Sequence, residues 1–197
     1  MDTAVVLIQE GGHCKSWPGG GFRTFVGVTP GALHGRCTNY VLVNAWIDGR
    51  LPAKAIVAIQ MKTIGGAIAG RTPAAVLIGS TLFVSWHSLS ASDNSDTSAL
   101  LKECVYILEK YTDVTRIVIG GDFNASPVDI DAMILRGGGE VYTQVFAPPL
   151  TTPTHPNSMK VLDFFVILSK NRPVKGSAIV ELVGASDHNA VIMDADW

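Results

Sequence analysis

The sequence carries little charge. Aspartate, glutamate, lysine and arginine make up 16% of its 197 residues, and the formal net charge is -2. The chain therefore lacks the positive field of proteins dedicated to binding nucleic acid, which weakens the case for such a role. No apolar run is long enough to cross a bilayer. The N-terminus shows no charged region followed by an apolar stretch and a cleavage site, so no signal peptide is visible: either the protein is cytosolic, or the sequence lacks its leader.

Cysteine is also scarce. The spacing of Cys14, Cys37 and Cys104 does not match a metal-ligand pattern. Cys104 falls on the apolar face of an expected helix, where it is predicted to be a buried small hydrophobe. Cys14 and Cys37 can pair in an oxidising compartment, and the sequence leaves that pairing open.

Short apolar segments and turns are abundant. Hydrophobic residues make up 47% of the chain, and 20 glycines and 10 prolines interrupt them. The segments are rich in valine and isoleucine, which favours strands over long helices. We predict one domain over residues 1–197, because neither a repeat nor a linker divides the chain. The expected strands are 3–9, 22–28, 39–47, 53–61, 74–78, 81–86, 116–119, 141–146, 161–168, 178–182 and 189–193.

Local signals add a hairpin and two helices. The Asp48-Gly49 turn predicts that 39–47 pairs with 53–61. Apolar residues recur at helical spacing from Leu100 to Tyr111, which predicts a helix capped by Asp93, Ser95 or Asp96. A second, short helix is expected over 128–135. Many strands with two helices favour an α/β sandwich of sheets with helices outside.

Carboxylates stand where several of these strands begin or end. Glu10 follows the first strand, Asp122 follows 116–119, and Asp187 precedes the last strand. A sheet can bring such distant carboxylates to one edge, where their oxygens suit Mg²⁺. Any one of them alone is better explained as a solvated or turn-capping group. Together they predict a metal site.

An amide and two imidazoles accompany the carboxylates. Asn124 lies two residues after Asp122, so both side chains can point into one cleft, although the segment also suits a turn. His188 is a candidate general base for a water nucleophile. Asp163 is the candidate to orient it, because a carboxylate inside an apolar strand needs a partner. His87 ends another apolar strand and can donate to a phosphate oxygen or a leaving group.

Arg71 and Thr154 are candidate substrate-binding residues. The guanidinium of Arg71 precedes a strand and can hold a phosphate through two hydrogen bonds, although a solvated arginine is the plainer alternative. Thr154 lies in a proline-rich loop whose hydroxyls can touch a phosphate, and a purely structural role is equally open. His13, His34 and His155 have no comparable context.

Three segments stand out in order along the chain: Gln9-Glu10, Gly121-Asp122-Phe123-Asn124 and Ser186-Asp187-His188. Together they resemble the endonuclease/exonuclease/phosphatase superfamily, of which deoxyribonuclease I is the familiar member. The similarity extends over nearly the whole chain. The second and third segments together are specific, whereas either alone is weak. The Arg71 region, the strand ending at His87 and the Asp163 strand are most similar to the B subunits of cytolethal distending toxins.

The resemblance implies a fold and a chemistry. The implied fold is a four-layered α/β sandwich of two mainly antiparallel sheets with outer helices. The implied reaction is Mg²⁺-dependent phosphodiester hydrolysis, with Mn²⁺ or Ca²⁺ as alternative ions. The implied roles are Glu10 and Asp187 on the metal, Asp122 and Asn124 at the phosphate and metal, His188 with Asp163 as the base, His87 as the second catalytic histidine, and Arg71 at the phosphate.

In one respect the sequence departs from the superfamily. It opens at the Glu10 strand, without the usual first strand, which carries an asparagine ligand, and without the helix that follows it. Three explanations stay open: a truncated chain, a second chain that supplies the missing strand, or lost activity with a retained fold. The missing strand would leave a sheet edge uncovered, which favours pairing with another chain.

The function we expect is an endonuclease that hydrolyses DNA with a metal- and histidine-activated water. One alternative is a phosphatase acting on phosphoinositides or other phosphate esters, which the near-neutral charge suits slightly better. Another is a catalytically impaired binding protein of the same fold. A toxin-like protein would need delivery subunits, and would be secreted and act in a host nucleus. Otherwise we expect a cytoplasmic location.

Overall fold

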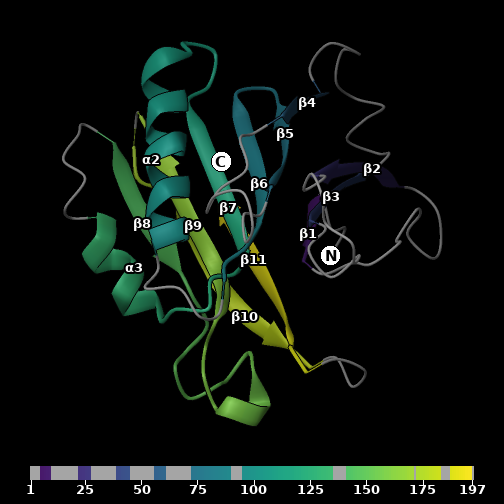
Figure 1. The fold of residues 1–197 in the computed structure, drawn as a ribbon, viewed down its shortest axis with the longest axis vertical. Helices are drawn as coiled ribbons and strands as arrows, with labels where there is room; N and C mark the ends of the chain where they lie inside the picture. Colours follow the sequence, from purple (N-terminus) through teal and green to yellow (C-terminus); the bar gives the residue numbers. More distant parts are fainter. Residues whose placement is uncertain are drawn as a thin grey trace.

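The structure is a computed structural model that describes residues 5–9, 22–27, 39–44, 56–60, 72–89, 95–134, 141–170, 172–182 and 187–196. Within these residues the chain forms three sheets, two α-helices and one short 3₁₀-helix (Figure 1). The largest sheet and its two faces determine where the polar strand ends come together.

The largest sheet has six strands in the order β4-β5-β6-β7-β9-β8. β6 and β7 run parallel, and the other neighbouring pairs of this sheet are antiparallel. The C-terminal ends of β6 and β7 therefore lie beside the start of β9. The strands are β4 (Ile56–Gln60), β5 (Ala74–Ile78), β6 (Thr81–His87), β7 (Arg116–Asp122), β8 (Tyr142–Phe146) and β9 (Asp163–Ser169).

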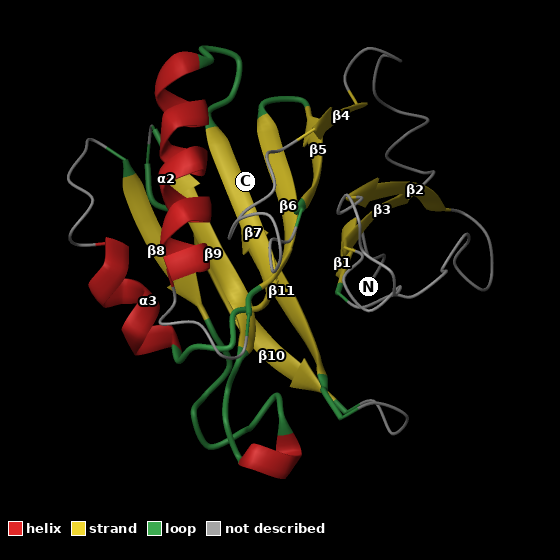
Figure 2. Ribbon diagram, in the orientation of Figure 1, coloured by secondary structure: helices red, strands yellow, loops and turns green. Residues whose placement is uncertain are grey.

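Two helices, α2 (Ser95–Lys110) and α3 (Pro127–Ile134), cover one face of this sheet (Figure 2). The apolar stripe of α2 packs on the strand residues that point toward it, among them Leu82, Val84 and Ile119. Cys104 belongs to this stripe and is fully buried, which confirms its prediction as a small hydrophobe. Burial raises the pKa of its thiol.

The opposite face carries two smaller antiparallel sheets, ordered β1-β3-β2 and β10-β11. Because side chains alternate along a strand, Val76 and Val118 point away from the helices. Val76 packs with Val41 and Val43 of β3, and Val118 packs with Met193 of β11. The strands are β1 (Val5–Ile8), β2 (Phe22–Gly27), β3 (Asn39–Asn44), β10 (Lys175–Glu181) and β11 (Ala190–Asp196).

The predicted strands and helices are confirmed as elements, but one pairing is wrong. Segments 39–47 and 53–61 were expected to form a hairpin. Instead β3 pairs with β1 and β2, while β4 pairs with β5 in the large sheet. A tight-turn signal is local, whereas β3 is positioned by burial of its valines between two sheets. The Asp48-Gly49 turn lies outside the described residues, as do Cys14 and Cys37.

The predicted fold class is found in part. The structure has mixed and antiparallel sheets with few helices, and the described helices cover only the large sheet. We expected one second sheet in this layer, but the described part of the chain forms two separate sheets there. Among the described residues, no helix is both long and apolar enough to span a membrane. The assignment of residues 1–197 to one domain stays a prediction.

Candidate active site

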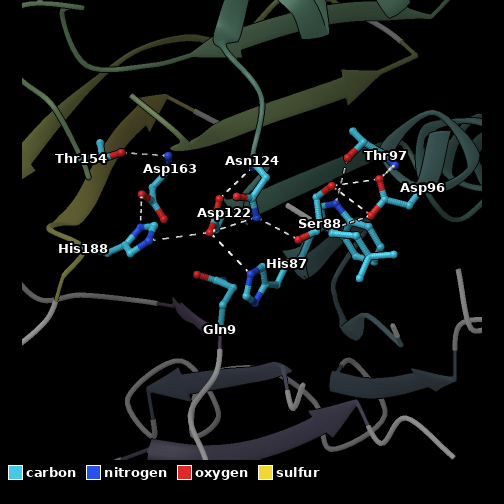
Figure 3. Close-up of polar contacts among 12 residues, drawn as sticks. Gln9, His87, Ser88, Asp96, Thr97, Asp122, Asn124, Thr154, Asp163 and His188 are labelled. Carbon is cyan, nitrogen blue, oxygen red and sulfur yellow. Dashed lines mark hydrogen bonds and ion pairs between the residues drawn. The ribbon is translucent and has the colours of Figure 1, made fainter. Parts of the chain in front are cut away.

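The polar side chains at the C-terminal ends of β6 and β7 meet those at the start of β9, at one end of the inner strands of the six-stranded sheet (Figure 3). Strand register pairs His87 with Asp122 across β6 and β7, and Asp122 with Asp163 across β7 and β9. His188 reaches the same place from the segment just before β11. Residues from four separate parts of the sequence thus share one site because of the sheet topology.

The turn after β7 fixes the carboxylate of Asp122. The backbone N–H of Asn124 donates to Oδ1 of Asp122 at 2.8 Å, and its side-chain amide donates to Oδ2 at 3.3 Å. Asn124 has a φ of 48°, a left-handed conformation that asparagine tolerates better than most residues. The turn interpretation and the site interpretation of this segment are therefore compatible.

Two imidazoles flank the same carboxylate. Oδ2 of Asp122 lies 3.5 Å from Nε2 of His87 and 3.8 Å from Nε2 of His188. The side chains of His87 and Asp122 are each 10% exposed, and that of His188 is 27% exposed. A nearly buried carboxylate between two imidazoles offers one anionic oxygen and two groups that hold or move protons.

His188 has an orienting carboxylate on its other nitrogen, as the sequence predicted. Nδ1 of His188 lies 2.7 Å from Oδ2 of Asp163. An ionised carboxylate only accepts hydrogen bonds, so Nδ1 carries the proton and donates it to Asp163. In the neutral imidazole the lone pair then sits on Nε2, on the side of Asp122. This arrangement is the one a general base needs.

Thr154 holds both members of this pair in place. Its buried hydroxyl oxygen accepts from the backbone N–H groups of Leu162 and Asp163, at 2.9 and 3.0 Å. Its carbonyl accepts from the N–H of Asn189, the residue after His188, at 2.7 Å. Thr154 thus has a structural role here, and its predicted contact with a phosphate stays a prediction.

The hydrogen bond to Asp163 raises the pKa of His188 to about 9, from an ordinary value of 6.5. Partial burial opposes the shift, while the negative charges of Asp163, Asp122 and Asp187 add to it. Because the folded pKa exceeds the unfolded one, protonated His188 stabilises the cation-free protein fully below about 6.5. That contribution is lost as the pH rises through about 9.

Replacing Asp163 with asparagine is expected to lower the pKa of His188 toward 6.5, because the charged acceptor is lost. An NMR titration of the imidazole signals in the cation-free protein measures this pKa. Asp113→Asn, in an exposed turn after α2, makes the same chemical change away from the site and should leave the pKa of His188 unchanged. An equal pKa in the parent and Asp163→Asn would contradict the assigned hydrogen bond.

A buried network on the other side supports Asn124. The Asn124 amide donates to the carbonyl of Ser88 at 2.9 Å. The Ser88 hydroxyl donates to Asp96, which also accepts from the N–H of Leu89 at 2.7 Å (Figure 3). Asp96 is 2% exposed in the first turn of α2. Asp96, one of the three capping candidates for this helix, thus also fixes the segment after β6.

Sequence reasoning did not assign a role to Ser88 or Gln9. The Gln9 amide donates to the Ser85 hydroxyl at 2.9 Å and reaches the Gly120 carbonyl at 3.4 Å. These bonds tie the end of β1 to β6 and β7 near the site. The available signal was position, because each residue directly neighbours a predicted site residue in the sequence.

The predicted site residues fall into two groups. The structure brings His87, Asp122, Asn124, Asp163 and His188 together. Asp187 is exposed beside His188. Glu10 and Arg71 lie outside the described residues, and their roles stay predictions.

Acidic groups gather around His188. The ligand atoms of Asp122, Asp163 and His188 lie within 4.8 Å of one another, and the same holds for His155, Asp187 and His188. Carboxylates collected near one point repel each other unless a cation lies close to them. Oxygen donors of this kind fit Mg²⁺. The donor set is therefore compatible with a divalent cation at this edge.

The fold matches solved structures over nearly the whole chain. The cytolethal distending toxin of Haemophilus ducreyi matches with a TM-score of 0.69 and 17% identity, covering 98% of this chain and 86% of that one. The cytolethal distending toxin from Actinobacillus actinomycetemcomitans matches with a TM-score of 0.66 and 17% identity, covering 96% and 84%. The endonuclease domain of the telomere-specific retrotransposon TRAS1 gives 0.58 and 17%, covering 96% and 84%.

These matches define the class of fold. The chain has the deoxyribonuclease I-like fold found in endonuclease/exonuclease/phosphatase proteins, which confirms the resemblance seen in the sequence at the level of the fold. No protein-family model matches the chain. No curated protein matches it by sequence either. At such low identities the likeness concerns the backbone arrangement, so activity has to be argued from the site.

Proposed function

We propose that this chain is a Mg²⁺-dependent phosphodiesterase whose substrate is DNA. One observation carries the proposal: the His188–Asp163 pair faces Asp122 and His87 at a single sheet edge. The two imidazoles and the supported Asp122–Asn124 turn match the chemistry expected from the sequence. The nuclease named among the similar structures supports DNA as the substrate.

In the proposed reaction, a water oxygen attacks the phosphorus while Nε2 of His188 takes its proton. Asp163 stabilises the imidazolium that forms, through the Nδ1 hydrogen bond. The bond from phosphorus to the leaving oxygen breaks, and His87 donates to that oxygen or to a phosphate oxygen. The side chains of Asn124 and Asp122 orient the phosphate group in the site.

A divalent cation supplies charge neutralisation at the phosphate when it is bound. Glu10 and Asp187 are the proposed metal ligands. With a pKa of about 9, His188 is protonated at neutral pH in the cation-free protein and cannot accept a proton. His188 would lose that proton more readily with a cation held nearby, because the two positive charges would repel each other, so cation binding and base activation would be coupled.

The test is cleavage of supercoiled plasmid DNA with Mg²⁺, comparing the parent with a variant carrying Asp187→Ala and His188→Ala. We expect nicking by the parent that EDTA abolishes, and little nicking by the variant. Equal nicking by both would dismiss the assignment. Phosphate release from phosphoinositide headgroups without plasmid nicking would move the substrate to small phosphate esters.

A partner chain is part of the same proposal. Among the described strands, β1 pairs only with β3, so its other edge has no strand partner there. An extended segment from another chain can add to such an edge. Toxin delivery subunits stay a prediction for this chain, because the match to whole cytolethal distending toxins concerns the fold.

A further inference from the structure

A third histidine, His155, forms a cluster of two imidazoles and one carboxylate with Asp187 and His188 of the proposed catalytic site. His155, Asp187 and His188 each offer a ligand atom, and these atoms lie within 4.8 Å of one another. The rings of His155 and His188 meet edge to face, with centroids 4.6 Å apart. The sequence assigned no role to His155, and the proposed reaction does not use it. In the fold it caps the short 3₁₀-helix Pro156–Ser158.

Both imidazoles are oriented through Nδ1, which leaves Nε2 to act as a ligand. In His188, Nδ1 is engaged by Asp163. In His155, Nδ1 lies 2.8 Å from the Ser158 hydroxyl and accepts from the Ser158 N–H at 3.1 Å. Second partners of this kind fix the ring and its tautomer in metal sites.

A metal at Nε2 of His155 requires the tautomer with its proton on Nδ1, in place of the one in which Nδ1 accepts from the Ser158 N–H. That state requires Nδ1–H to donate to the Ser158 hydroxyl oxygen. The backbone N–H of Ser158 then keeps the His155 carbonyl as its acceptor, at 3.2 Å. The Ser158 hydroxyl also has this carbonyl within 3.4 Å as an acceptor. Every polar group of the turn therefore retains a partner when Nε2 binds a metal.

We infer that His155, Asp187 and His188 form a binding site for a borderline transition-metal ion such as Zn²⁺, which overlaps the proposed catalytic site at Asp187 and His188. Two imidazoles with one carboxylate suit Zn²⁺ and Co²⁺, whereas Mg²⁺ prefers oxygen ligands. Tetrahedral ligand atoms around Zn²⁺ lie about 3.4 Å apart, and the three ligand atoms here lie within 4.8 Å of one another, so at most a small movement is needed to reach that spacing. Asp187 is exposed, which leaves its side chain free to make that adjustment.

This site has a consequence for catalysis, which rests on the proposed function. A metal on Nε2 of His188 occupies the lone pair that the base needs. Zn²⁺ is therefore an inhibitor of the Mg²⁺-driven reaction, and His155 is the residue that makes inhibition possible at low Zn²⁺ concentration.

The test uses Co²⁺ as a spectroscopic probe that needs no turnover. The parent should develop the visible absorption of imidazole-bound Co²⁺, and Zn²⁺ should displace it. His155→Gln should weaken Co²⁺ binding by at least about tenfold. Asn157→Ala, an exposed change in the same loop, should bind Co²⁺ as the parent does. No visible band in the parent, or equal binding by His155→Gln, would overturn the site.

A second arm separates the site from the proposed function. With plasmid and Mg²⁺, each variant is measured against its own Zn²⁺-free rate. Half-inhibition of His155→Gln should need at least about tenfold more Zn²⁺ than the parent. Equal Zn²⁺ sensitivity would overturn the inhibitory role. A chain without nuclease activity that still binds Co²⁺ through His155 would reject the proposed function and support the metal site.

Discussion

Changing His188 to alanine is expected to lower the rate of Mg²⁺-dependent DNA cleavage by about 10²–10⁴-fold, the usual contribution of a general base. Asp163→Asn should cause a loss in the same range, because the amide no longer holds the Nδ1–H tautomer or stabilises the imidazolium. The hydrogen bond of 2.7 Å between the two side chains makes them one functional unit. The double variant should therefore be no slower than the slower single variant.

The measurement is single-turnover cleavage of a defined duplex at saturating Mg²⁺, followed over a range of pH. Asp113→Asn serves as the matched carboxylate control, because Asp113 is exposed in a turn after α2. Losses that multiply in the double variant would show that His188 and Asp163 act independently, against the proposed role of the pair. In the parent, the rate should rise with pH because only the neutral imidazole accepts a proton. A flat profile would remove His188 as the base.

The largest stability effect is expected at Gly121, in the strand that carries Asp122. Gly121 has a φ of 151°, which lies in a backbone region that residues other than glycine rarely adopt. A methyl group there would overlap the backbone carbonyl oxygen of Trp86 on the neighbouring strand and crowd the Gln9 amide. Gly121→Ala should lower the free energy of unfolding by about 3–5 kcal/mol through backbone strain and overpacking.

Gly79→Ala is the matched control for that change. Gly79 also has a positive φ, 59°, but an added methyl group there meets no atom within 4 Å. Its cost should be about 1–2 kcal/mol, from backbone conformation alone. Urea unfolding followed by tryptophan fluorescence measures both. Equal losses at the two glycines would show that the contact with Trp86 does not matter.

Elements with strong local signals were predictable. Apolar periodicity predicted α2, and valine- and isoleucine-rich segments predicted the strands, because both patterns reflect which side chains are buried. The His188–Asp163 pair was also predictable, since a carboxylate in an apolar strand needs a partner nearby. The hairpin between 39–47 and 53–61 failed because a turn signal does not report which sheet a strand joins.

The supporting residues were less accessible. The sequence named Asp96 as one of three capping candidates for α2, and the structure places it in the first turn of that helix. Its hydrogen bonds to Ser88 and Leu89 depend on how α2 packs on β6. The sequence left Thr154 open between a phosphate contact and a structural role. The structure shows its hydroxyl accepting from two backbone N–H groups at the start of β9, and the phosphate contact stays a prediction. No sequence pattern pointed to His155, because its proposed role depends on its contact with His188 in the folded chain.

The sequence by itself predicted which side chains carry the chemistry and that they stand where apolar strands begin or end. Only the tertiary structure decided that Asp122 takes two imidazoles on one oxygen, and that a third histidine joins Asp187 beside them. The reason is physical: burial and residue type are encoded locally along the chain. Strand order, and the approach of atoms across it, result from the packing of the whole sheet.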